Sequence, residues 1–113
     1  MHFLKCHLII FLFFVSNLCH AQFVYSVDYV SQADIKVFVV DYESQADLNV
    51  FKVKYQSEAK GNEGLWYFVD YRSQSDKTIY FVDYKSQADL LIYFVDYKSQ
   101  ARWKKRSKIH LMH

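Results

Sequence analysis

Residues 80–101 read YFVDYKSQADLLIYFVDYKSQA, and the string YFVDYKSQA occurs in them twice, at positions 80–88 and 93–101. The same pattern runs through most of the chain when one tyrosine of each copy is aligned. The aligned residues are Tyr29, Tyr42, Tyr55, Tyr71, Tyr84 and Tyr97. This regular spacing, which only the step from Tyr55 to Tyr71 interrupts, indicates an internal repeat of six units.

The middle spacing is longer because of an insertion at residues 61–64 (GNEG), which contains both glycines of the chain. The repeat therefore divides into two halves of three units, residues 22–60 and 65–102, joined by a hinge at 61–64. A basic segment, 103–113, closes the chain. By length, residues 22–113 make one domain.

Each unit predicts one short β-strand followed by a turn. An aromatic residue and a valine always stand four and two residues before the tyrosine, and a serine follows it by two. In an extended strand these positions share one face. The opposite face is looser, because the residue five before the tyrosine is always apolar but the residues three before and one after vary. We expect this second face to be partly wet.

The recurring Ser-Gln-Ala-Asp is the predicted turn, because serine and aspartate side chains bond nearby backbone groups. The same residues fit a helix capping box, but the next strand begins at once, so at most one helical turn fits. Valine, isoleucine, tyrosine and phenylalanine dominate the strand segments. The chain is therefore predicted to be all-β.

The ends of the repeat predict a closed architecture. Open stacks of repeats need atypical polar caps at their termini. Here the first and last units are nearly standard, and the third departs most, with Lys54, Glu58 and Lys60 replacing Asp, Gln and Asp. We therefore predict a ring of six strand-turn units in which the first and last units meet, since closure protects the strand edges.

Residues 1–21 have the layout of a secretory signal peptide. Leu8–Val15 is an unbroken apolar run, and Ser16–Ala21 is a polar, small-residue close. We expect cleavage between Ala21 and Gln22 and export to the periplasm or the medium. The apolar run is shorter than the ~20 residues of a membrane-spanning helix, so no transmembrane segment is expected after cleavage.

Two other interpretations of this segment stay open, a lipid attached to Cys19 and an uncleaved anchor. Both cysteines, Cys6 and Cys19, lie in the part to be removed. The exported domain would then have no disulfide, although its compartment permits one. The formal net charge of +2 indicates no particular charged partner.

The repeated VDYxSQAD, the glycine-containing break before LWYFV and the ending RWKKRSKIHLMH resemble the septoil-knot family of small bacterial proteins. The resemblance covers residues 22–113. It implies a β-rich domain whose backbone winds round a ring as a seven-crossing torus knot, an exception to the general absence of knots. Departures from the pattern are those of the third unit and Ser75, which replaces alanine in the fourth. The resemblance implies no established activity.

The residues repeated in each unit have two interpretations. Structurally, they bond between neighbouring units and build the ring, a role that suits the apolar body and hydroxyl tip of tyrosine. Functionally, their carboxylates gather round calcium or their tyrosines bind a glycan or peptide. We favour the structural role, because such repeats mostly encode stacking. The set is Asp28, Tyr29, Ser31, Asp41, Tyr42, Ser44, Tyr55, Ser57, Asp70, Tyr71, Ser73, Asp83, Tyr84, Ser86, Asp96, Tyr97 and Ser99. Further aspartates, Asp34, Asp47, Asp76 and Asp89, end the turns.

The sequence offers no constellation for catalysis. A serine nucleophile needs a histidine partner, and the only histidines after residue 21 are His110 and His113, both in the tail. No third ligand accompanies them, so a metal site is not predicted either. We therefore predict no enzyme activity and no cofactor.

The tail carries five basic residues within 102–108. Such a cluster suits nucleic acid, anionic lipid or acidic glycan, but export argues against nucleic acid. The alternative, which we favour, is that the tail folds back on the ring through its apolar residues. The candidate contact residues are Arg102, Trp103, Lys104, Lys105, Arg106 and Lys108.

The sequence thus predicts an exported, non-catalytic structural or interaction module. Its contact surface would combine the basic tail with the variable residue that follows each tyrosine. These residues are Val30, Glu43, Gln56, Arg72, Lys85 and Lys98. The partner is an unidentified envelope or extracellular protein or glycan. The alternative is a ligand-binding ring for calcium or a glycan at the repeated aspartates and tyrosines.

Overall fold

A computed structural model describes residues 21–113. The predicted signal peptide therefore lies outside the described residues, except for Ala21. Each unit forms one short strand and one short 3-10 turn, which confirms the strand-turn repeat and agrees with the limit of at most one helical turn. The strands are β1 (Phe23–Ser26), β2 (Ile35–Val39), β3 (Leu48–Lys52), β4 (Leu65–Phe68), β5 (Lys77–Phe81), β6 (Leu90–Phe94) and β7 (Arg102–Trp103). The 3-10 segments are η1 (Val30–Gln32), η2 (Glu43–Gln45), η3 (Gln56–Glu58), η4 (Arg72–Gln74), η5 (Lys85–Gln87), η6 (Lys98–Gln100) and the longer η7 (Arg106–Met112).

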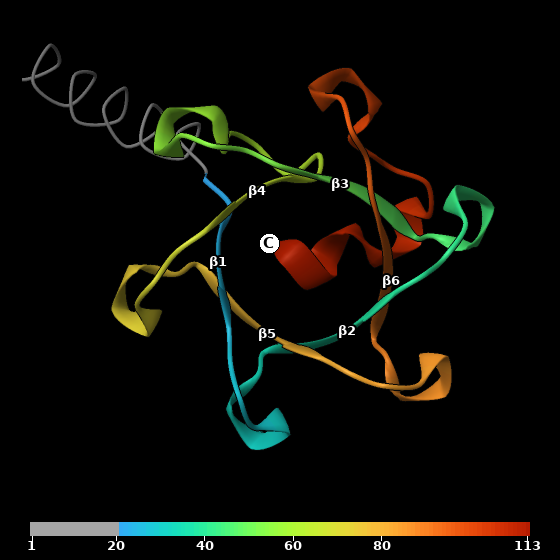
Figure 1. Ribbon diagram of the computed structural model, residues 1–113, viewed down its shortest axis with the longest axis horizontal. Coiled ribbons are helices and arrows are strands. Elements are labelled where there is room, and N and C mark those ends of the chain that lie inside the picture. The colour runs from blue at the N-terminus through green and yellow to red at the C-terminus, as the bar shows by residue number, and fades with distance from the viewer. Residues whose placement is uncertain (1–20) are drawn as a thin grey trace, which may run out of the picture.

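The first six strands close into a ring in which every neighbouring pair is parallel (Figure 1). Around the ring the order is β1, β5, β2, β6, β3, β4 and back to β1. Strands of the first half therefore alternate with strands of the second half. The predicted closed all-β ring is confirmed, and each of the six strands has a partner on both sides.

The first and last units do not meet, so that part of the prediction is wrong. β1 lies between β4 and β5, and β6 lies between β2 and β3. Each repeat unit carries the chain two places round the ring, so the first lap leaves every second place empty. The second lap can enter the empty places only if the chain once advances by a single place. It does so between β3 and β4, where the insertion lengthens the tyrosine spacing.

Gly64 lies at this junction of the two laps. Its φ is +89°, and a Cβ at this position would collide with the backbone carbonyl of Asn49. Its own carbonyl accepts a 2.9 Å hydrogen bond from the N–H of Phe51. The backbone of the junction therefore packs directly on β3. The edge of β3 that faces away from β6 has two partners, because Phe51 pairs with parallel β4 and Leu48 pairs with antiparallel β7.

Four turn-ending aspartates connect the two laps, and we call these contacts aspartate clamps. The backbone N–H of each aspartate donates to the carbonyl of one residue on an adjacent strand. The carboxylate accepts a bond from the N–H of that same residue, so both backbone groups of one residue are satisfied. The pairs, with the carboxylate-to-nitrogen distance, are Asp34–Thr78 (3.0 Å), Asp47–Leu91 (2.9 Å), Asp76–Phe23 (3.0 Å) and Asp89–Lys36 (3.0 Å).

Side chains inside the ring form stacked layers. The central layer, five residues before each tyrosine, has 0% exposure throughout and comprises Val24, Val37, Val50, Trp66, Ile79 and Ile92. The expectation of a partly wet face is therefore wrong for this layer, which is the centre of the core. It holds for the layer three residues before each tyrosine, where Val39 is 37% exposed and Lys52 is exposed. The aromatic residues four before the tyrosine are half-buried on the outside of the ring.

The C-terminal segment closes one mouth of the ring, the mouth at which the strands begin (Figure 1). Met112 is 1% exposed, and its carbonyl accepts a 2.7 Å hydrogen bond from Gln22 Nε2. Trp103 is also buried, and Ile109 and Leu111 pack against the core. The favoured expectation that the tail docks on the ring agrees with this arrangement. Among residues 21–113 no helix combines the length and apolarity that crossing a membrane requires.

Candidate interaction surfaces

Six loops project outward from the ring (Figure 1), and we call them petals. They are residues 28–34, 41–47, 54–60, 70–76, 83–89 and 96–102. Each petal has its tyrosine immediately before the 3-10 turn, with an exposed fraction of 67–68% in all six. No tyrosine hydroxyl bonds to another group within residues 21–113, so the predicted ladder of tyrosine bonds between units is not formed there.

The other repeated residues of the petals are exposed as well. This holds for the aspartates before the tyrosines, Asp28, Asp41, Asp70, Asp83 and Asp96. It also holds for the serines Ser31, Ser44, Ser57, Ser73, Ser86 and Ser99. The aspartates that bond between units are those of the clamps, one turn further along the chain. The structure therefore uses the second set of aspartates for bonds between units and leaves the first set facing solvent.

The variable residue after each tyrosine is also exposed in every petal. Val30 is the apolar one, with an exposed fraction of 52%. Lys98 lies 3.7 Å from Glu58 of another petal, and Arg72 Nη2 donates to the carbonyl of Gln32 at 3.4 Å. Both contacts are solvent-exposed and contribute little to stability. All six residues thus lie on the rim, although Glu43 Oε1 accepts a 2.7 Å bond from Asn49 Nδ2, and their role as a contact surface stays a prediction.

The basic tail is divided between docking and solvent. Trp103 is buried, and its Nε1 donates to the carbonyl of Asn62 at 2.8 Å. Lys104 Nζ donates to the carbonyl of Glu43 at 2.8 Å, and Arg106 lies 3.5 Å from Glu63. Arg102 and Lys105 are exposed on the surface.

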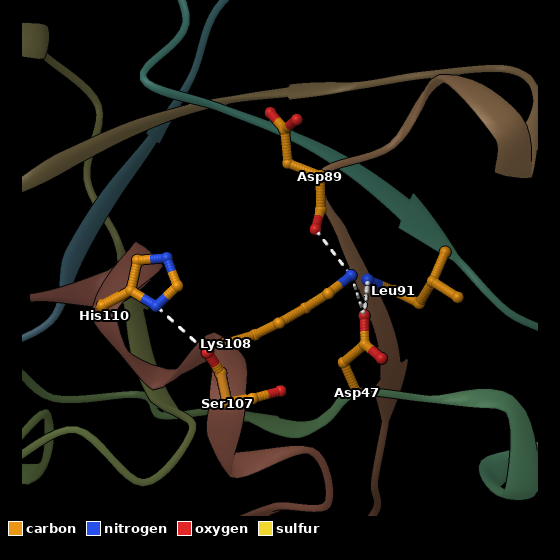
Figure 2. Close-up of polar contacts among 6 residues, drawn as sticks. All are labelled: Asp47, Asp89, Leu91, Ser107, Lys108 and His110. Carbon is orange, nitrogen blue, oxygen red and sulfur yellow. Dashed lines mark hydrogen bonds and ion pairs between the residues drawn. The ribbon is translucent and has the colours of Figure 1, made fainter.

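Lys108 reaches furthest into the structure (Figure 2). Its Nζ lies 3.1 Å from Asp47 Oδ2 and donates to the carbonyl of Asp89 at 3.0 Å. The same Asp47 oxygen also accepts the N–H of Leu91. One carboxylate thereby ties η7 to both laps of the ring, so Lys108 and Trp103 serve the fold and are withdrawn from the predicted contact surface.

The mouth at which the strands end is lined by a mixed layer. Phe68, Phe81 and Phe94 of the second half are half-buried there and pack against the core. Lys52 Nζ lies over two of these rings, 5.2 Å from the centre of Phe68 and 4.5 Å from that of Phe94. Such cation–π contacts cover part of the apolar surface with a charged group.

A groove of about 540 Å³ lies on the outside of the ring between two petals. Its floor includes Tyr80 of β5 and Lys36 of β2, which face each other in the strand register. One wall is the petal from Asp83 to Asp89, and the other includes Val30. A concave site of this size with an aromatic floor and a few polar groups is the usual form of a small-ligand site.

The clamp at Asp34 has an electrostatic consequence. The N–H of Thr78 is the main cause that holds the pKa of Asp34 below its ordinary value, and the Thr78 hydroxyl adds to the effect. The positive charges of Lys77 and Arg72 act in the same direction, whereas partial burial opposes them. The clamp therefore favours the ionised carboxylate.

Within residues 21–113 no three histidine, cysteine, aspartate or glutamate side chains gather where a metal ion could bind. Calcium needs several oxygen ligands around one point. The clamp carboxylates accept backbone N–H groups, and the other repeated aspartates lie on separate petals. The described part of the chain thus offers nothing in support of the calcium alternative.

The fold and these surfaces define a class, the interleaved parallel β-rings whose chain makes two laps. Comparison with protein families matches residues 21–104 to the 7(1) septoil knot domain. The chain belongs to the septoil-knot family. Two interleaved laps through one ring are how a chain winds on a torus, in agreement with the family's name. Neither the curated proteins nor the solved structures contain a match to the chain.

The groove and the half-buried phenylalanine layer were not predicted from the sequence. Both arise from strands far apart in the chain, so a repeat read unit by unit does not reveal them. A signal for the groove was present, since Lys36 is charged whereas the equivalent residues of the other five units are uncharged. It becomes interpretable only when the register places it against Tyr80.

Proposed function

We propose that this protein is an exported, non-catalytic interaction module that uses the six tyrosines of its petals as contact points. The rigid ring holds these tips in fixed positions, and each tip presents an aromatic ring with an adjacent polar and charged edge. Tyrosine is favoured in protein interfaces because it supplies a large contact area and loses little conformational entropy. Several weak contacts on one rigid body add up to useful avidity.

The uniform exposure of the tyrosines carries this proposal. All six units keep tyrosine at a position where the side chain is 67–68% exposed and its hydroxyl has no bond within residues 21–113. The backbone there is extended, with φ between −124° and −129°, which any residue adopts. Neither the packing nor the backbone conformation therefore requires a tyrosine at this position. By contrast, the clamp position, where the aspartate of four units bonds to a neighbouring strand, is occupied by Lys60 and Arg102 in the other two units.

Export and the absence of catalysis are parts of the same proposal. The layout of residues 1–21 supports export, with cleavage between Ala21 and Gln22. His110 and His113 lie in the docked C-terminal segment, away from the petal serines in sequence, and support no nucleophile–base pair. The partner class is a protein or glycan of the cell envelope or the medium.

A pair of six-fold variants tests the role of the tyrosines. Changing Tyr29, Tyr42, Tyr55, Tyr71, Tyr84 and Tyr97 to serine should leave the melting temperature within a few degrees, because little area is buried there. Changing the same six to phenylalanine is the matched control that keeps the aromatic surface. The measurement is capture of surface components from the producing cells by the wild type and both variants.

We expect a component that the wild type and the phenylalanine variant retain and the serine variant loses. Equal capture by all three proteins would show that the tyrosines are not the contact points. Unfolding of the serine variant would instead show that the tyrosines are needed for the stability of the fold.

A further inference from the structure

The pseudo-symmetry of the ring provides two internal comparisons for the groove at Tyr80. Moving by one unit in either direction converts the Lys36–Tyr80 pair into Phe23–Tyr67 or Asn49–Tyr93. All three pairs lie directly opposite each other in parallel strands that belong to different laps. The same place in the fold is therefore seen three times with different side chains.

In the two sister positions side chains of the protein make contacts with one another. Phe23 packs against Tyr67, with ring centroids 5.6 Å apart. At the other position Asn49 is fully buried, and its Nδ2 donates to Glu43 Oε1 at 2.7 Å and to the Gln100 carbonyl at 3.3 Å. These contacts join the two petals across the strand pair.

At the central position the equivalent contacts are missing within residues 21–113. Val30 stands where the sister site has Glu43, and Lys36 stands where it has Asn49. A valine side chain cannot accept the bond that Glu43 accepts, and Lys36 has no ion-pair partner within the described residues. The two petals therefore stay apart, and the groove of about 540 Å³ remains between them.

The lining selects a class of ligand. Tyr80 contributes a half-buried aromatic ring, and Ser86 and Gln87 contribute a hydroxyl and an amide. The charged groups are the Lys36 ammonium and the carboxylates of Asp83 and Asp89, so both signs are present. Either net charge on a ligand would meet a like charge, whereas neutral hydroxyls donate to carboxylates and accept from an ammonium.

We propose that this groove binds a neutral pyranose sugar, as a free saccharide or as a residue of a glycan. The C–H face of the sugar ring lies on Tyr80, and its hydroxyls bond to Lys36, Asp83 and Gln87. A volume of this size accommodates one or two sugar rings. Two petals form the walls of this site, but it is distinct from the tyrosine tips of the proposed function because none of the six tyrosines lines the groove.

The test is saturation-transfer NMR on the full chain, expressed with its leader and purified as its host processes it. The probes are glucose, galactose, mannose and N-acetylglucosamine, followed by the β1,4-linked tetramers of glucose and N-acetylglucosamine. Glucuronate and glucosamine serve as anionic and cationic counterparts. We expect saturation transfer to the ring protons of at least one neutral sugar, with dissociation constants measured by titration.

Two variants locate the binding. The double change Val30→Glu and Lys36→Asn transplants the closing contacts of the sister site and should weaken sugar binding at least tenfold while keeping the melting temperature. Tyr80→Leu removes the aromatic floor and should have a similar effect on binding. The six-fold serine variant of the petals is the matched control, and it should bind the sugar as the wild type does.

No transfer to any neutral sugar in the panel would overturn the proposal, as would unchanged binding in the Val30→Glu, Lys36→Asn variant. Tighter binding of glucuronate or glucosamine would overturn the neutral class. Loss of sugar binding in the serine variant alone would assign sugar binding to the exposed tyrosines and overturn the groove as its site. Because partner capture and sugar binding respond to different variants, failure of one proposal is distinguishable from failure of the other.

Discussion

Aspartates that are alike in the repeated sequence differ in their surroundings. Asp47 is 6% exposed, and one of its oxygens accepts both the Leu91 N–H and the Lys108 ammonium. The other clamp aspartates are exposed and form no ion pair within residues 21–113. If the carboxylate is removed, water can bond to the freed backbone N–H more readily at Asp76 or Asp89 than at Asp47. Burial therefore decides how much each clamp contributes to the free energy of unfolding.

This difference predicts unequal effects of removing two clamps. Asp47→Ala should lower the free energy of unfolding by about 2–3 kcal/mol, because it leaves the Leu91 N–H without an acceptor and the half-buried Lys108 ammonium without its negatively charged partner. Asp76→Ala, the matched exposed clamp, should cost about 1 kcal/mol. Urea unfolding of both variants and the wild type measures the difference. Equal losses would show that burial does not decide the strength of a clamp.

The lowered pKa of Asp34 predicts that the stability contributed by its clamp depends on pH. Its pKa in the folded protein lies below the ordinary value of 3.8, so the folded state binds fewer protons than the unfolded state in the interval between the two. The stabilisation by the ionised carboxylate is therefore complete above the unfolded pKa and is lost as pH falls through the folded pKa. The difference in unfolding free energy between wild type and Asp34→Asn should be constant from pH 7 to 5 and shrink below pH 4. A difference that grows on acidification would contradict the assigned direction.

At the scale of elements, η7 is the part that the repeat does not explain. It occupies the mouth at which the strands begin, and its last residues join the core of a ring that would otherwise be open there. Its attachment is of two kinds, apolar burial at Met112 and polar contacts at Lys108. The apolar contact is expected to dominate, because part of the ion pair's attraction offsets the cost of desolvating its charges.

Met112→Ala is therefore expected to lower the free energy of unfolding by about 2–4 kcal/mol, the usual cost of truncating a buried methionine. His110→Ala in the same element should change it by less than about 0.5 kcal/mol, because this side chain is exposed. Thermal or urea unfolding of the two variants provides the comparison. A small effect of Met112→Ala would mean that the stability of the ring does not depend on the burial of η7 in its mouth.

At the scale of the whole molecule, neither half contains a sheet of its own. β1, β2 and β3 pair with strands of the second half and not with one another. The contacts that stabilise the fold are thus long-range in sequence, and such contacts form only after the entropy of closing long loops has been lost. The two halves are alike in sequence but do not form separate folding units.

Expressing residues 22–60 and 65–113 as separate chains should give two unfolded polypeptides. Their circular dichroism should lack the β signal of the intact chain, and their amide resonances should be poorly dispersed. Mixing the two chains should restore the β signal only if the strands of one chain can insert between those of the other without a covalent link. A folded isolated half would refute the interleaved arrangement.

The sequence by itself determined the periodic properties of this protein. The repeat period, the strand and turn of each unit and the all-β class followed from local side-chain patterns, and the closed ring followed from the nearly standard first and last units. The alternation of side chains along a strand and the residue preferences of a turn depend on neighbouring residues, so they can be recognised in each unit. The family was recognisable from the same motif.

Only the tertiary structure decided which units are neighbours and which surfaces stay open. Six nearly identical units are equally able to pair with one another, and the choice depends on the one-place advance between β3 and β4. The register then places Lys36 against Tyr80 and withdraws Trp103 and Lys108 into the fold. These outcomes depend on contacts between residues 40 or more positions apart, which no local pattern encodes.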